Sequence, residues 1–221
     1  MPPVISRVIR LALDINVLYA DFLAAKRGFR ASASSYLVEA VRTGECEAGP
    51  VQLIVTVPMI ENWSDVMRRR LGASKEDAEE IALMLHDYAT DGPLTIPPNV
   101  VIGAGFVPFS TDEEARKALI EHAKPENEAK LFDEISGDRY VLMGALAGKA
   151  DILTTTDIGD FNRGSAIGFK NRNDVLIYPT AGHSVVIGKP AFVAHHLRSG
   201  VIPDLAHIRG NPLEFEPAQT P

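Results

Sequence analysis

A chain of 221 residues is long enough to form one domain with a substantial hydrophobic core. Its hydrophobic fraction of 46% and its charged fraction of 23% are close to the averages for globular proteins, which excludes wholesale disorder. A formal charge of −7 argues against a protein that coats nucleic acid non-specifically, because such binding needs many Lys and Arg residues to neutralise phosphates. It does not exclude an enzyme with a local basic groove.

The cysteine content and the hydropathy of the sequence indicate the cellular compartment in which the protein is expected. Cys46 is the one cysteine in the sequence, so an intramolecular disulfide is excluded, and the N-terminal segment lacks the pattern of a secretory signal. No apolar run approaches the roughly 20 residues that span a bilayer. We therefore expect a cytoplasmic protein that makes no contact with a membrane.

Strands and helices are predicted to alternate along the chain. An almost continuous apolar run predicts a buried strand at residues 8–13 that ends at Asp14, and Asn16 can cap the helix that follows. The next elements are expected as a helix over 32–44, a strand over 52–57, a helix over 58–72, a helix after Ser74, a helix from Asp138 to about 148, a strand over 152–155, a last strand over 175–178 and a helix from Pro190 that ends before Gly200. This order is typical of an α/β protein with a mainly parallel sheet.

The elements divide the chain into a single domain and a tail. We expect the domain to cover residues 1–200 and to contain an inserted helical segment at about 103–137, preceded by a short strand over 100–102. Residues 201–221 contain four prolines and are predicted to form an extended C-terminal tail.

Carboxylates follow two of the predicted strands directly. Asp14 follows the first strand and Asp157 follows the strand over 152–155, while Glu61 and Asp138 lie near helix starts that face the same rim. Functional groups collect outside the C-terminal ends of parallel strands. Clustered carboxylates repel one another, and an all-oxygen set favours Mg²⁺ or Mn²⁺ over zinc. Such ions can activate water beside a scissile phosphate.

Each of these acids also has a purely structural interpretation. Asp14 after a strand can be a helix cap, and Asp138 and Asp160 can cap the segments that follow them. Glu61 can be a solvated residue on the face of a helix. The repeated placement at strand ends favours the metal site.

Three segments together resemble PIN domains. The sequence LALDINVLYADFLA, residues 11–24, is similar to the family's opening motif, and GDRYVLMGALAGKADILTTTDIGDF, residues 137–161, is similar to its second signature. PMIENWSDVMRRRLG, residues 58–72, fits the intermediate helix. The resemblance covers most of residues 8–195 and implies a three-layer α/β/α fold with a central mainly parallel sheet.

The resemblance also assigns roles to individual residues. It implies four metal-site and catalytic acids with an auxiliary fifth acid, namely Asp14, Glu61, Asp138, Asp157 and Asp160. Asn16 and Thr155 match positions that support such a site by hydrogen bonding.

Two features depart from the family pattern. Ile15 stands where many members carry Thr or Ser, which removes one hydrogen bond. The link over 103–137 is longer than usual, and either Asp133 or Glu134 within it could replace Asp138 as a ligand.

The resemblance implies a divalent-metal-dependent endoribonuclease that hydrolyses phosphodiester bonds in RNA. Many PIN proteins are toxins of toxin–antitoxin pairs, so an antitoxin protein is a candidate partner. It also implies a homodimer, for which Leu37, Val38 and Val41 are the candidate contact. Arg68 and Arg69 are candidates for contacts with the substrate phosphates, although charges at a helix end also interact with its dipole.

Two other functions are alternatives to the nuclease. One is a non-catalytic PIN-like module that binds nucleic acid or serves as a scaffold. The other is a phosphohydrolase of the haloacid-dehalogenase type, which needs a second Asp at the position of Asn16. His195 and His196 are adjacent on a predicted helix and therefore point in different directions, so we interpret them as incidental.

Overall fold

The fold was obtained as a computed structural model, which describes residues 7–29, 31–91, 139–163, 166–179 and 183–218. The expected strand over 100–102, the expected insertion over 103–137 and the acids Asp133, Glu134 and Asp138 lie outside the described residues.

A seven-stranded sheet forms the centre of the protein, with the strand order β2-β3-β1-β4-β7-β6-β5. Four adjacent strands, β3, β1, β4 and β7, run parallel to one another. The pairs β2–β3, β7–β6 and β6–β5 are antiparallel. The expected α/β fold with a mainly parallel sheet is therefore confirmed. The strands are β1 (Ile9–Leu13), β2 (Glu45–Cys46), β3 (Gly49–Ile54), β4 (Ile152–Thr154), β5 (Ile167–Phe169), β6 (Arg172–Pro179) and β7 (Ser184–Gly188).

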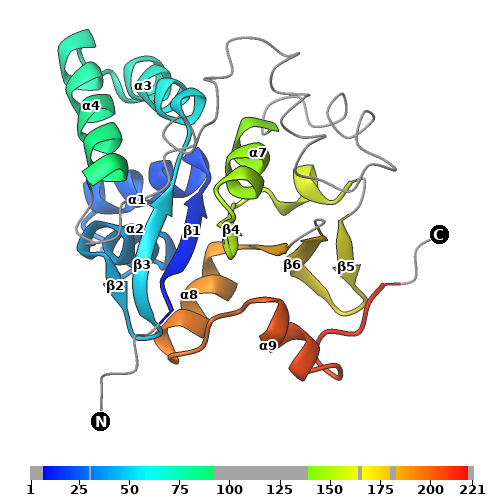
Figure 1. The fold of residues 1–221 in the computed structure, drawn as a ribbon. Coiled ribbons are helices and arrows are strands. Elements are labelled where there is room, and N and C mark those ends of the chain that lie inside the picture. Colours follow the sequence, from blue (N-terminus) through cyan, green and yellow to red (C-terminus); the bar gives the residue numbers. More distant parts are fainter. Residues whose placement is uncertain (1–6, 30, 92–138, 164–165, 180–182, 219–221) are drawn as a thin grey trace.

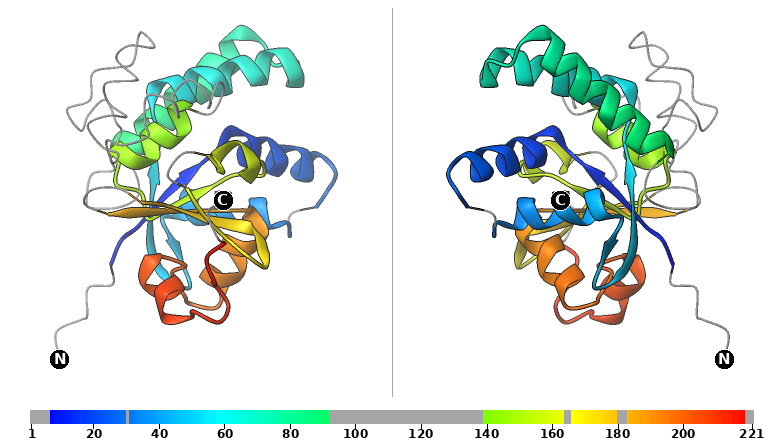
Figure 2. Two further views of the ribbon diagram at one scale, coloured as in Figure 1. Left: turned by 90° about the vertical axis from the view of Figure 1, so that its right-hand side faces the viewer. Right: turned by 90° about the vertical axis from the view of Figure 1, so that its left-hand side faces the viewer.

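Helices cover both faces of this sheet. In Figure 1, α1 and α2 lie behind β1 and β3, whereas α7 lies in front of β4. Figure 2 shows α3 and α4 at one end of the protein and α9 at the other. The helices are α1 (Ile15–Lys26), α2 (Ala33–Thr43), α3 (Val57–Leu71), α4 (Lys75–Asp91), α7 (Arg139–Ala147), α8 (Pro190–Arg198) and α9 (Leu205–Gly210), with one 3-10 turn, η1 (Ile158–Phe161). Among the residues described, no helix combines the length and the apolar character needed to cross a membrane.

The register of the sheet brings two of the predicted acids to the same edge. Leu13, the last residue of β1, pairs with Thr154, the last residue of β4, in a parallel ladder. Asp14 and Asp157 follow these two residues on neighbouring strands. The predicted placement of both acids at one edge is therefore confirmed.

Helix ends follow the signals in the sequence. The hydroxyl oxygens of Ser32 and Ser74 each accept a hydrogen bond of 3.0 Å from the amide three residues later, which satisfies an otherwise unpaired donor. Gly44 and Gly72 end α2 and α3 with positive φ angles of 77° and 69°, where a side chain would be strained. These helices therefore begin and end close to the predicted positions.

The predictions missed three strands, namely β2, β5 and β7. A single last strand over 175–178 was expected to lead directly into the final helix, but β6 turns back into β7, and β5 precedes them. β7 is the strand that pairs with β4 in the parallel ladder. Its five residues form a short apolar run, which periodicity alone does not distinguish from the start of the following helix.

The predicted extended tail is also wrong over part of its length. Residues after Val201 contain α9, and Ile208 and Phe215 are buried in the core. Arg7 donates a hydrogen bond of 2.7 Å to Asp204, the residue that caps α9. The described prolines of this segment, Pro203, Pro212 and Pro217, therefore do not keep Ile208 and Phe215 out of the core.

The face proposed for a dimer contact lies inside the protein. Leu37 is fully buried, Val41 is almost fully buried, and Val38 packs against the same core. They belong to α2, which contacts α1 and α8. The hydrophobic stripe of α2 therefore stabilises this fold and is not available to a second copy.

Helix α7 lies unusually close to β3 because it carries small residues. A Cβ added at Gly148 would lie 2.3 Å from Cγ2 of Ile54, and one added at Gly144 would lie 2.5 Å from Cγ2 of Thr56. Contacts this short are not tolerated, so both positions require glycine. The close packing fixes the C-terminal end of α7 against the sheet.

Replacing Gly148 with Ala should lower the free energy of unfolding by about 1–3 kcal/mol, because the added methyl group forces Ile54 or the helix to shift. Chemical denaturation measures this difference. Gly210→Ala is the matched control, because nothing lies within 4 Å of a Cβ at that position, and its effect should stay within about 0.5 kcal/mol. Equal effects of the two substitutions would contradict the close approach of α7.

Candidate functional site

Asp14 lies at the centre of the candidate site, where β1 ends and α1 begins. Its side chain is fully buried, with 0% of its surface exposed. The residue occupies the capping position of α1, but its side chain makes no capping hydrogen bond. Its amide donates to the carbonyl of Thr154 at 2.9 Å, which continues the ladder between β1 and β4. The interpretation of Asp14 as an ordinary helix cap therefore fails.

One carboxylate oxygen of Asp14 is held by two donors. Oδ2 accepts hydrogen bonds from Nδ2 of Asn16 at 2.6 Å and from Oγ1 of Thr155 at 2.7 Å. The other oxygen, Oδ1, is buried and has no hydrogen-bond partner among the described residues. Buried polar atoms without a partner are rare, because leaving one unpaired costs about 1–3 kcal/mol. With Oδ2 held by Asn16 and Thr155, Oδ1 remains able to interact with a group other than these two side chains.

Asn16 and Thr155 connect the two strand ends. Oδ1 of Asn16 accepts from the amide of Thr156 at 3.0 Å, while Oγ1 of Thr155 accepts from the amide of Asp157 at 3.1 Å. Asn16 lies inside the first turn of α1, so the expectation that it caps this helix is wrong. The two side chains that orient Asp14 therefore also hold the backbone that leads to Asp157.

Burial changes the acidity of Asp14. Removal from water raises the pKa of the Asp14 carboxyl above its ordinary value of 3.8. The hydrogen bond from Thr155 and the amides at the start of α1 lower the pKa, but they offset only part of the effect of burial. The pKa of Asp14 is thus raised overall, and a positive charge close to the carboxylate would lower it.

The other predicted acids lie in more open positions. Asp157 is exposed and precedes η1, and Asp160 is partly buried in the first turn of η1, so it does not cap that turn. Glu61 is exposed on α3. Within the described ranges, no three His, Cys, Asp or Glu side chains lie close enough together to hold a metal ion. Glu61 and Asp160 therefore do not complete a three-residue cluster with Asp14 and Asp157.

The donor set still fits a divalent cation at Asp14. The unpartnered Oδ1 is an anionic oxygen in a buried position, and hard cations such as Mg²⁺ and Mn²⁺ prefer carboxylate oxygens. A bound ion would satisfy this oxygen and favour the ionised carboxylate. A proton would satisfy it at low pH. Asp157 would contribute a second carboxylate from the adjacent strand end.

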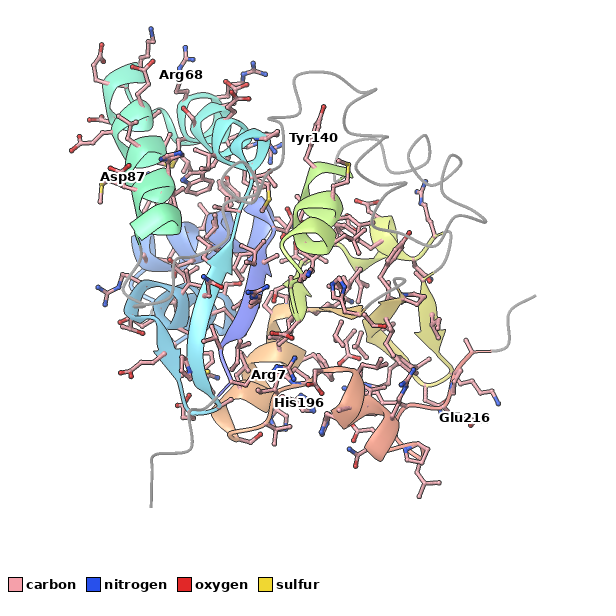
Figure 3. The ribbon with its side chains drawn as sticks, in the orientation of Figure 1. Arg7, Arg68, Asp87, Tyr140, His196 and Glu216 are labelled. Carbon is pink, nitrogen blue, oxygen red and sulfur yellow. The ribbon has the colours of Figure 1, made fainter. Side chains whose placement is uncertain are left out.

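The two arginines predicted to contact phosphate lie on the last turn of α3. Both are exposed, and Arg69 forms an ion pair of 2.8 Å with Asp65 one turn earlier. Figure 3 shows Arg68 and Tyr140, near the start of α7, at the upper end of the protein. Arg68 is thus accessible to a ligand, whereas Arg69 would have to exchange its partner.

The two histidines lie side by side on α8, where His195 is exposed and His196 is buried. His196 is buried in α8, where its Nδ1 lies 3.0 Å from the carbonyl oxygen of Phe192. Its ring contacts that of His207 at a centroid distance of 5.1 Å, so it helps to hold the C-terminal segment. Burial lowers its pKa, which favours the neutral ring. Figure 3 places His196 at the lower end of the protein.

The chain matches no protein-family profile and no curated protein. The resemblance to PIN domains therefore rests on the residues quoted above.

Asp14→Asn should change how stability depends on pH when EDTA is present. Because the folded-state pKa of Asp14 is raised, its contribution to stability is present below about pH 4 and is lost as the pH rises through the folded pKa. The free energy of unfolding of the wild-type protein should therefore fall relative to that of Asp14→Asn between about pH 4 and pH 7. Urea denaturation at several pH values measures the difference.

Asp87→Asn is the control, because Asp87 is exposed on α4. Its stability should follow that of the wild type across the same pH range. Parallel curves for the wild type and Asp14→Asn would contradict the burial of an ionisable Asp14.

Proposed function

We propose that this protein is a divalent-metal-dependent nuclease that hydrolyses phosphodiester bonds in RNA. The supporting observation is the buried Asp14, which has one carboxylate oxygen held by two donors and the other without a partner, at the C-terminal edge of parallel strands. Asp157 follows the adjacent strand, and its amide donates a hydrogen bond to Oγ1 of Thr155, which also holds Asp14. The preference for RNA is taken from the resemblance to PIN ribonucleases.

Within this proposal, the chain orients an ion and does not form a covalent intermediate. Asn16 and Thr155 hold Oδ2 of Asp14, so that Oδ1 is directed toward the ion. Such supporting hydrogen bonds fix the ligand geometry before the ion binds. When bound, Mg²⁺ or Mn²⁺ lowers the pKa of a water molecule and neutralises charge on the phosphate.

The exposed acids would complete the site from the solvent side. Asp157 is open to solvent beside the buried Asp14, so its carboxylate can contact the ion or its bound water. Family resemblance adds Asp138, which directly precedes α7, and Glu61 on α3. Arg68 on α3 is exposed and carries charge that can contact a phosphate outside the reacting bond. This local positive charge allows RNA binding despite the net charge of −7.

The biological setting of the proposal also follows the resemblance. A nuclease of this kind can act as the toxin of a toxin–antitoxin pair, with a short antitoxin as its partner. A homodimer would bring two such sites together, but its contact would have to lie outside the buried face of α2.

Purified protein should cleave single-stranded RNA in Mg²⁺ or Mn²⁺, and EDTA should abolish the activity. Asp14→Asn should lower the cleavage rate by about 100-fold or more, because the loss of the charged ligand removes about 3 kcal/mol of transition-state stabilisation. Asp87→Asn, purified in the same way, should keep full activity and also controls for a contaminating ribonuclease. An Asp14→Asn protein with unchanged rate and metal dependence would exclude the proposed mechanism.

Mn²⁺ should also stabilise the wild-type protein without any substrate. At a concentration about 100 times the Kd, a ligand that binds only the folded state adds about 2.7 kcal/mol of stability. For a chain of this size, that corresponds to a rise in Tm of about 5–10 °C. Differential scanning calorimetry should show this rise for the wild type and for Asp87→Asn, and a much smaller one for Asp14→Asn. An equal rise in Asp14→Asn would place the ion elsewhere.

A further inference from the structure

A cavity of about 460 Å³ lies between η1 and the β5–β6 hairpin. In Figure 1, η1 is the short yellow-green turn of helix above β6 and β5. Ile158, Gly159 and Asn162 line the cavity from the side of η1, and residues of β5 and β6 form the opposite wall. The cavity is thus built by the segment that directly follows Asp157.

The carboxylate of Asp157 lies next to the cavity wall. A Cβ added at Gly159 would lie 3.5 Å from Oδ1 of Asp157, so the carboxylate packs over the glycine that lines the cavity. A phosphate bound near Asp157 would therefore have an adjoining base within reach of the cavity.

The walls combine apolar surface with two carboxamides. Ile167, with 40% of its surface exposed, and Leu176 contribute the apolar part. Asn162 and Asn173 are exposed, and neither side chain forms a hydrogen bond with another described residue. Apolar walls with a few polar groups are typical of small-molecule sites. Each carboxamide offers a donor and an acceptor, as the edges of nucleobases require.

The charge of the cavity favours a base over a phosphate. Arg172 is the one cation among the described residues that line the cavity. Its Nε and Nη2 donate to Asp174 at 3.0 Å and 2.9 Å, and it also forms an ion pair with Glu214. No unpaired cation among those lining residues is thus available to an anion. The group that fits is neutral and flat, with polar edges.

We propose that this cavity binds one base of the RNA, next to the phosphate that is cleaved, and that Asn162 and Asn173 recognise the polar edge of the base. The proposal rests on the nuclease function given above and adds base selectivity to it. Gly168 lies between the two kinds of wall, since a Cβ there would lie 3.6 Å from Cδ2 of Leu176 and 3.8 Å from Oδ1 of Asn162.

Titration of the EDTA-treated protein with AMP, GMP, CMP and UMP, followed by NMR, tests the cavity without the metal. The wild type should bind at least one of the four, and Asn162→Ala should bind it about tenfold more weakly because a hydrogen bond to the base is lost. Asn173→Ala gives a second measurement if Asn162→Ala does not fold.

Asn171→Ala is the matched control, because Asn171 lies on the same hairpin but does not line this cavity. It should bind the nucleotide like the wild type. In the cleavage assay, the ratio of rates on RNAs of different base composition should fall toward one in Asn162→Ala and stay unchanged in Asn171→Ala.

The outcomes separate the two proposals. Cleavage by a wild-type protein that binds none of the four nucleotides, or binding unaffected by both Asn162→Ala and Asn173→Ala, would overturn the base site alone. Nucleotide binding that depends on Asn162 in a protein that cleaves no RNA would support the base site and overturn the nuclease function.

Discussion

The two hydrogen bonds to Oδ2 of Asp14 connect the fold to its candidate site. They come from Asn16 in the first turn of α1 and from Thr155 just after β4, so they require both strand ends to be in register. They also leave Oδ1 unpartnered inside the protein, which costs stability in the absence of a ligand. A buried carboxylate of this kind is rarely retained for stability alone, and the cost is explained if a cation completes the site.

The surrounding packing maintains this register. β1 lies between β3 and β4 in the centre of the sheet, and its residues Ile9 and Leu11 are fully buried. Gly144 and Gly148 let α7 approach β3 and α3 closely, while Gly188 accepts a hydrogen bond from Thr155 at the end of β7. The parallel sheet therefore holds the buried carboxylate of Asp14, whereas the exposed Asp157 lies just before η1 and the partly buried Asp160 lies within it. This division suits a site in which one ligand is fixed and the others meet the substrate.

Much of the fold follows from local signals. These signals are hydrophobic runs, serine caps and glycines that end helices, such as Gly44 and Gly72. Each depends only on residues close to it in the sequence. Together they predicted most of the helices and the strands β1, β3 and β4. β2, β5 and β7 were not predicted because strands of two, three and five residues show too little periodicity, and because β7 is defined by its pairing with β4. Burial of Phe215 likewise depends on contacts with residues far away in the chain, which a proline-rich segment does not reveal.

The sequence by itself determined which acids follow which strands, because short local patterns of residues predict where strands end and helices begin. It therefore placed Asp14 and Asp157 at one sheet edge, and the resemblance to PIN domains added Asn16 and Thr155 as supporting residues. Only the tertiary structure decided what each atom does there: which oxygen of Asp14 is held and which is free depends on two strands pairing across 141 positions of the chain. The cavity beside η1 is of the same kind, since Asn162 and Asn173 lie on separate segments that meet only when the hairpin folds back.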